Sequence, residues 1–134
     1  MNDIANTERG AVIEIGGESY ALILTTKATK AISGKYGGLD VLGEQLMRAE
    51  NYELALTEIV WLVTLLANQS VMINNLKHPD SPRVLLTEDM VDLLTTPFEL
   101  ATYREAVTAA IFMGTRRGVE SEEDPNSKNV RTTG

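Results

Sequence analysis

The sequence predicts a mainly α fold of the α+β type, in which a small N-terminal β-hairpin precedes a bundle of about five helices around one long central helix. Three observations support this fold class. Residues 52–77 contain no glycine or proline and repeat apolar side chains at helical spacing. Residues 11–24 form two strand-like runs on either side of a Gly-Gly pair, which is typical of a hairpin. The other segments up to residue 118 are short, begin at helix-capping residues and are apolar on one side.

The chain divides into three regions. We expect a flexible N-terminus at residues 1–10, a single helical domain with its N-terminal hairpin at residues 11–118, and a disordered acidic tail at residues 119–134. A chain of 134 residues with 43% hydrophobic content is long enough for one domain with a substantial core. It has no cysteine, so disulfides and thiolate zinc ligands are excluded, which fits a reducing cytoplasm. Residues 1–10 have neither the basic start nor the apolar run of a secretory signal.

The net charge of −7 argues against a polyanionic partner. Nucleic acids and acidic membrane surfaces repel a protein of this sign unless a local basic patch overrides the repulsion. Two basic groups stand out, the pair Arg116-Arg117 and the group Lys27, Lys30 and Lys35, and neither is interleaved with exposed aromatic residues. We therefore predict no nucleic-acid partner.

The predicted central helix spans Tyr52–Lys77. Its helical stripe consists of Ala55, Ile59, Leu62, Leu66, Ile73 and Leu76. Between Ile59 and Ala67 the other faces are apolar too, so this part of the helix must be covered on all sides. The apolar run from Ile59 to Ala67 is much shorter than the roughly 20 residues that a bilayer core requires. We therefore expect a core helix and no membrane association.

The hairpin is predicted to pair Ala11–Ile15 with Ser19–Leu24. Gly16-Gly17 suits a type I′ turn because both central residues of that turn need positive φ. Since an isolated two-stranded hairpin is marginally stable, its apolar face should lie against the helices.

Two short helices are expected before the central one. Thr25 or Thr26 caps the first, at Lys27–Ser33, and Asp40 caps the second, which continues to Arg48. The glycine-rich residues 33–38 between them lack the G-x-x-x-x-G-K-[ST] order of a phosphate-binding loop, so we expect a turn.

A loop and two helices follow the central helix. His78-Pro79-Asp80-Ser81-Pro82 cannot continue the helix because of its two prolines. Thr87 caps a short helix that should bury Val91, Leu93 and Leu94, and Thr96-Pro97-Phe98-Glu99 has the sequence of a capping box. The last helix should end at Gly118. Its predicted inner face consists of Leu100, Tyr103, Val107, Ala110, Ile111 and Gly114.

Residues 119–134 are polar and cannot bury enough apolar area to offset the entropy of ordering, so we expect disorder. Their acidic cluster consists of Glu120, Glu122, Glu123 and Asp124. Two interpretations stay open: a solubilising tail, or a segment that contacts a partner or acts as a spacer.

The sequence shows no constellation of catalytic residues. His78 is the only histidine, and it shares a proline-bounded loop with Asp80 and Ser81, a spacing that does not assemble a nucleophile, a base and an orienting group. Glu58, the only carboxylate near the apolar middle, is either a buried acid or a solvent-facing boundary residue. We predict that the protein is not an enzyme and has no cofactor and no metal site.

The order of these segments resembles a known family. The hairpin is followed by YALILTTKATKAISGKYGGLDVLGEQL, then by EIVWLVTLLANQSVMINN, by a helix ending GTRRG, and by the acidic VESEEDPNSKN. This arrangement is similar to that of the tail assembly chaperones of long-tailed bacteriophages and prophages, particularly those of Gram-positive hosts. The stretch from TTKA to YGGL and the tryptophan helix ending in LANQ carry most of the resemblance, which covers nearly the whole chain.

The resemblance implies a mostly helical protein that coats and solubilises the tape measure protein in the host bacterial cytoplasm until tail tube subunits replace it. It also implies absence from the mature virion. Family members are often made in two lengths through a ribosomal frameshift, and the longer form recruits tail tube protein. A homo-oligomer stays open. The alternative hypothesis is a structural virion component, such as a head-tail connector or a tail completion protein.

A tape measure protein is a long helical chain with apolar stripes, which would aggregate before its tube forms. We expect contact with it through the helix surfaces around Met72, Met90, Tyr103 and Met113, because methionine adapts to varied apolar partners. The alternative is that these four side chains belong to the core.

Overall fold

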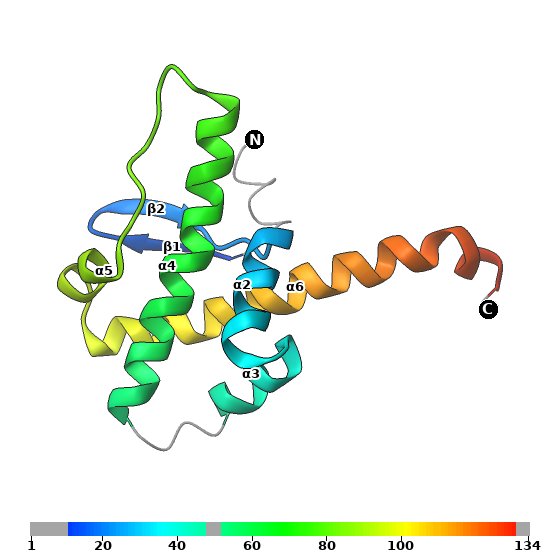
Figure 1. The fold of residues 1–134 in the computed structure, drawn as a ribbon, viewed down its shortest axis with the longest axis horizontal. Helices are drawn as coiled ribbons and strands as arrows, with labels where there is room; N and C mark the ends of the chain where they lie inside the picture. Colours follow the sequence, from blue (N-terminus) through cyan, green and yellow to red (C-terminus); the bar gives the residue numbers. More distant parts are fainter. Residues whose placement is uncertain (1–10, 48–51, 131–134) are drawn as a thin grey trace.

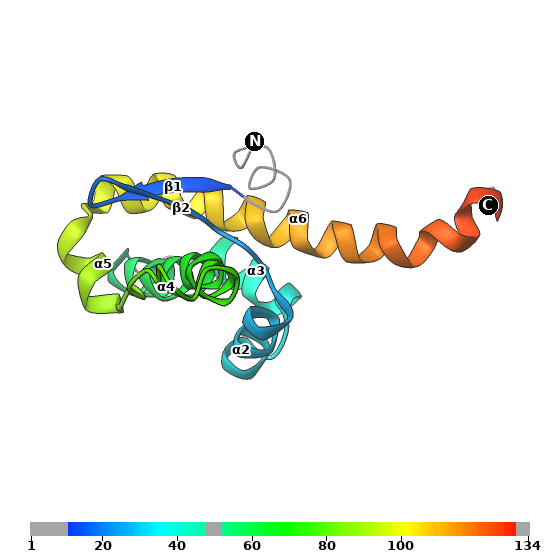
Figure 2. The ribbon, with the colours of Figure 1, turned by 90° about the horizontal axis from the view of Figure 1, so that it is seen from above.

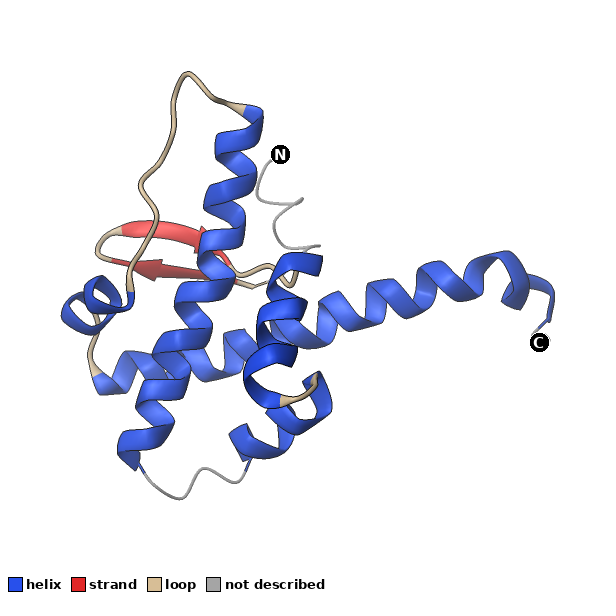
Figure 3. Cartoon of the chain, viewed as in Figure 1, coloured by secondary structure: helices blue, strands red, loops and turns tan. Residues whose placement is uncertain are grey.

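The computed structural model describes the backbone of residues 11–47 and 52–130 and the side chains of residues 11–42, 44, 45 and 56–115. Over this part of the chain a two-stranded antiparallel hairpin precedes five helices, which confirms the predicted fold class (Figure 1, Figure 3). The elements are β1 (Val12–Ile15), β2 (Glu18–Ala21), α2 (Thr26–Tyr36), α3 (Leu39–Met47), α4 (Tyr52–Lys77), α5 (Glu88–Leu94) and α6 (Pro97–Val130). The predicted flexible N-terminus, residues 1–10, lies outside the described residues.

The hairpin has the predicted turn. Gly16 and Gly17 have φ of 60° and 86°, as a type I′ turn requires, and Ile13 pairs with Tyr20 across the two strands. Ile13 and Ile15 are buried, whereas Val12 is 48% exposed on the opposite face. The side chains of β1 therefore alternate between the core and the solvent.

Tyr20 to Ile23 are all buried, so the segment at the end of β2 has no solvent face. The hairpin contacts two helices: β1 lies beside α6, and β2 packs against α4 (Figure 2). Just beyond β2, the Ile23 N–H donates to the carbonyl oxygen of Leu66 at 3.3 Å, which ties the chain to α4. Successive side chains of an extended segment point to opposite faces, so the burial of all four residues means that the rest of the chain covers both faces of this segment.

Helix α4 has the predicted bounds, Tyr52–Lys77, and the rest of the domain packs around it (Figure 1). Its fully or almost fully buried apolar side chains are Ile59, Val60, Leu62, Val63, Leu66, Ala67 and Val71. Trp61 is half-buried; its ring meets that of Tyr36 edge to face, with the centroids 6.0 Å apart. The Lys35 ammonium lies 4.9 Å from the Trp61 centroid. The apolar middle of α4 is therefore covered by its own chain.

Three of the predicted helix starts are confirmed by hydrogen bonds. The Ala28 N–H donates to Thr25 Oγ1 at 3.0 Å, and the Met90 N–H donates to Thr87 Oγ1 at 3.1 Å. In the capping box, the Glu99 N–H donates to Thr96 Oγ1 at 3.2 Å while the Thr96 N–H donates to Glu99 Oε1 at 2.9 Å. These reciprocal bonds satisfy backbone donors that a helix start leaves unpaired.

Two boundaries in the first half of the chain differ from the prediction. Helix α2 continues past Ser33 to Tyr36 and ends at Gly37, whose φ is 97°, because Gly34 weakens a helix without stopping it. Helix α3 begins at Leu39, so Asp40 lies in its first turn and not before it.

Helix α6 buries Leu100, Tyr103, Val107 and Ala110 as predicted. Gly114 is partly buried, and a Cβ atom there would lie 2.7 Å from Leu24 Cβ. The backbones of α6 and of the segment before α2 therefore approach closely at this glycine.

The predicted end of the last helix at Gly118 is wrong. The backbone of residues 119–130 is helical where we expected a disordered tail, and it projects away from the body of the domain (Figure 1, Figure 2). A glycine permits a helix to end but does not force it, and a helix already formed extends without a new nucleation step. The glutamates of this segment are also good helix formers. Residues 131–134 lie outside the described part of the chain.

The prediction for α5 is wrong at two positions. Val91 is fully buried, but Leu93 is 77% and Leu94 47% exposed. A helix of seven residues has room on its inner face for few side chains, and Val91 occupies that face.

Candidate functional site

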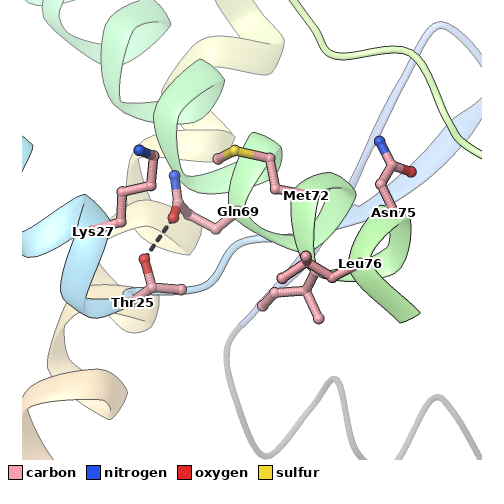
Figure 4. A pocket seen from close by; sticks show the side chains of 7 residues that line it. Thr25, Lys27, Gln69, Met72, Asn75 and Leu76 are labelled. Carbon is pink, nitrogen blue, oxygen red and sulfur yellow. Dashed lines mark hydrogen bonds between the residues drawn. The ribbon is translucent and has the colours of Figure 1, made fainter. Parts of the chain in front are cut away.

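An open apolar groove lies between the C-terminal part of α4 and the start of α2 (Figure 4). We call it the α4 groove; it has a volume of about 560 Å³. Its lining consists of Thr25, Lys27, Gln69, Met72, Ile73, Asn75 and Leu76.

The groove exists because α4 extends beyond the elements that cover its middle (Figure 1). Leu76 is 83% exposed, and Met72 and Ile73 are half-buried. Met72 and Leu76 are four residues apart and Ile73 and Leu76 three apart, so all three side chains share one face of the helix. Ile73 and Leu76 were both predicted to lie on the core stripe; this is wrong for Leu76, because the stripe continues past the end of the domain body.

Most polar side chains of the groove already have partners within the chain. Thr25 Oγ1 donates to Gln69 Oε1 at 2.5 Å, and Gln69 Nε2 donates to the Leu65 carbonyl oxygen at 2.9 Å. Asn75 Nδ2 donates to the Arg83 carbonyl oxygen at 3.0 Å, and Asn75 Oδ1 accepts the Arg83 N–H at 2.8 Å. These groups stabilise the walls of the groove and leave its apolar side chains as the surface offered to a ligand.

The asparagines of α4 hold the loop that follows it. Asn68 Nδ2 donates to the Leu86 carbonyl oxygen and Asn68 Oδ1 accepts the Leu86 N–H, both at 2.8 Å. Asn75, seven residues later, makes the corresponding pair of bonds with Arg83. This arrangement was not predicted from the sequence. The sequence does contain a signal for it: Asn68 and Asn75 are seven residues apart, so their side-chain amides lie on one face of the helix, just before a loop with two prolines.

The structure separates the four predicted contact residues. Met72 lines the α4 groove, whereas Met90 on α5 and Met113 on α6 are half-buried and lie elsewhere. Tyr103 is 6% exposed, and its hydroxyl donates to the Glu14 carbonyl oxygen, so the prediction of a contact surface at Tyr103 is wrong. Its ring joins α6 to the hairpin, a core position that the helical spacing with Leu100 and Val107 also indicated. Burial, followed by the Glu99 and Glu14 carboxylates, raises the pKa of Tyr103.

The acidic cluster of Glu120, Glu122, Glu123 and Asp124 lies on the projecting part of α6. Its side chains are outside those described, so its predicted role in partner contact stays a prediction.

A second, smaller hollow of about 300 Å³ lies near the starts of α4 and α6 and the end of α5. Its lining includes Leu56, Asp92, Thr95 and Pro97. It exposes less apolar surface than the α4 groove because the carboxylate of Asp92 and the hydroxyls of the threonines share its walls.

No cluster of potential metal ligands occurs in the described part of the chain. His78 is exposed in the loop after α4. Glu58 is half-buried, and its carboxylate accepts a hydrogen bond from the Tyr36 hydroxyl, so it is neither a fully buried acid nor a free boundary residue. Arg83 pairs with Glu18 at 3.2 Å and lies over the Tyr20 ring, which fastens the loop to the hairpin.

In the described part of the chain, one helical segment, Leu56–Lys77, is long and apolar enough to cross a membrane by length and composition alone. It forms the centre of this domain, and core helices meet the same criterion. The expectation of no membrane association stays a prediction.

The fold and the groove define a mainly helical domain with an open apolar surface. No protein-family model matches this chain, and neither does any curated protein or solved structure to which it was compared.

Proposed function

We propose that this protein is a phage tail assembly chaperone that binds apolar helical segments of the tape measure protein and keeps that protein soluble during tail assembly. The α4 groove is the observation that supports the proposal most directly. It presents Met72, Ile73 and Leu76 on one helix face, which is the form of surface that receives the apolar face of a partner helix.

Two further properties suit a chaperone. The net charge of −7 favours solubility while the groove stays open. Met72 has an unbranched side chain that adapts to different apolar partners, which a chaperone that binds at many places along a tape measure protein requires. In this proposal the chain acts in the host bacterial cytoplasm, is absent from the mature virion, and reaches the tail tube protein through a longer frameshifted form.

The test is co-expression of the intact chain with the tape measure protein of the same genome. We expect the tape measure protein to move from the insoluble to the soluble fraction and to be retained with the tagged chain. Leu76→Asp should abolish both effects, because it places a charge in the groove. Leu93→Asp is the matched control, since Leu93 is similarly exposed, at 77% against 83%, but lies on α5.

Two results would contradict the proposal. One is a tape measure protein that stays insoluble with the wild-type chain. The other is detection of the chain in purified mature particles by mass spectrometry, which would favour the alternative of a structural virion component.

A further inference from the structure

Lys27 is the one polar residue lining the α4 groove that has no hydrogen bond or ion pair among the described residues. The side chains of Thr25, Gln69 and Asn75 are bonded to groups of the same chain. A ligand in the groove therefore meets apolar carbon and sulfur atoms and one ammonium group that no described residue pairs with. The complementary ligand is apolar and carries one negative charge at its edge.

We propose that the α4 groove selects helical segments that carry a carboxylate beside their apolar stripe, and that Lys27 binds this carboxylate. The inference rests on the proposed function for the class of partner, a helix of another protein, and adds the charge that this helix must carry. Apolar contact with Met72, Ile73 and Leu76 provides affinity, while Lys27 fixes the direction in which the helix lies.

The position of Lys27 supports this assignment. Lys27 is exposed and lies in the first turn of α2, where the backbone N–H groups of the helix add partial positive charge. None of the described side chains that line the groove is acidic, although the whole chain has a net charge of −7. A local positive charge on an acidic protein discriminates between ligands that differ only in the sign of the charge on one residue.

Binding of two fluorescein-labelled helical peptides to the intact chain tests the proposal. The peptides share one stripe of leucines and differ at a single position beside the stripe, which is Glu in one and Lys in the other. We expect the wild-type chain to bind the Glu peptide about two- to fivefold more tightly in fluorescence anisotropy, the range for an exposed ion pair. The preference for the Glu peptide should shrink in 0.5 M salt, because salt screens the attraction between the two charges.

Lys27→Glu should reverse the preference. Lys30→Glu is the matched control, because it changes the net charge equally and lies one turn further along the exposed side of α2 without lining the groove. Leu76→Asp should remove binding of both peptides.

Equal affinity of the wild-type chain for both peptides would overturn the proposal, as would an equal effect of Lys30→Glu. Self-association in sedimentation equilibrium that is lost in Leu76→Asp and excludes the peptides would also overturn it, because a second copy would then fill the groove. The two proposals fail separately: a charge preference without retention of the tape measure protein rejects the proposed function, and retention without a charge preference rejects the role of Lys27.

Discussion

Replacement of Gly114 by alanine should destabilise the fold, although alanine is normally the better helix former. The new Cβ would lie 2.7 Å from Leu24 Cβ and 2.9 Å from Leu24 Cδ2. Because Leu24 Cβ is fixed to the backbone, relief requires movement of α6 or of the segment before α2. Such overpacking costs roughly 1–3 kcal/mol, against a gain of about 1 kcal/mol in helix propensity. The net expectation is a loss of up to about 2 kcal/mol in the free energy of unfolding.

Gly34→Ala is the matched control, because a Cβ atom at Gly34 in α2 has no neighbour within 4 Å. It should gain about 0.5–1 kcal/mol from helix propensity alone. The difference between the two variants, roughly 1–3 kcal/mol, then measures the contact at Gly114 without the propensity term. Urea unfolding followed by far-UV circular dichroism gives both values. Equal stabilisation of the two variants would refute the close approach of α6 to Leu24.

Three other predictions concern the contacts that shape the domain. Tyr103→Phe should lose about 1 kcal/mol at pH 7, because the Glu14 carbonyl oxygen loses its donor. The pKa of Tyr103 is raised in the folded state, so its hydroxyl contributes fully to the free energy of unfolding below the ordinary pKa of about 10. This contribution is lost as pH rises above 10. In urea unfolding, the wild type should therefore lose its advantage over Tyr103→Phe above pH 10. Asn68→Ala removes both hydrogen bonds to Leu86 and should lower the free energy of unfolding by about 1–3 kcal/mol. Limited proteolysis of residues 78–87 should also become faster. Unchanged proteolysis would contradict the role of Asn68 in holding this loop. Thr96→Ala should lose about 1 kcal/mol in thermal unfolding, and no change would show that the capping box is dispensable.

The elements of this fold that could be predicted are those specified by local chemistry. The Gly16-Gly17 turn, the Thr96 capping box and the bounds of α4 each follow from residues adjacent in sequence, because turn geometry, capping and helical spacing are local properties.

The parts that could not be predicted depend on contacts between distant segments. Leu62 and Leu76 hold the same position in the seven-residue apolar repeat, yet Leu62 is fully buried and Leu76 is exposed, because β2 and α6 cross α4 before its C-terminal end (Figure 1). From the sequence, Tyr103 could be either a core residue or a contact residue. The carbonyl group that binds its hydroxyl and fixes it in the core belongs to Glu14, 89 residues away in the chain. Met72 was predicted as a contact residue, but its neighbours in the groove, Thr25 and Lys27, come from another helix and its cap.

The central claim is that the partner helix binds in the α4 groove, and methyl NMR of the intact chain labelled at the methyl groups of its five methionines tests it most directly. On addition of a soluble tape measure segment, the Met72 signal should shift, because Met72 lines the groove, while those of Met90 and Met113 stay in place. Shifts of Met90 or Met113 with an unchanged Met72 signal would contradict the claim and place the partner on α5 or α6.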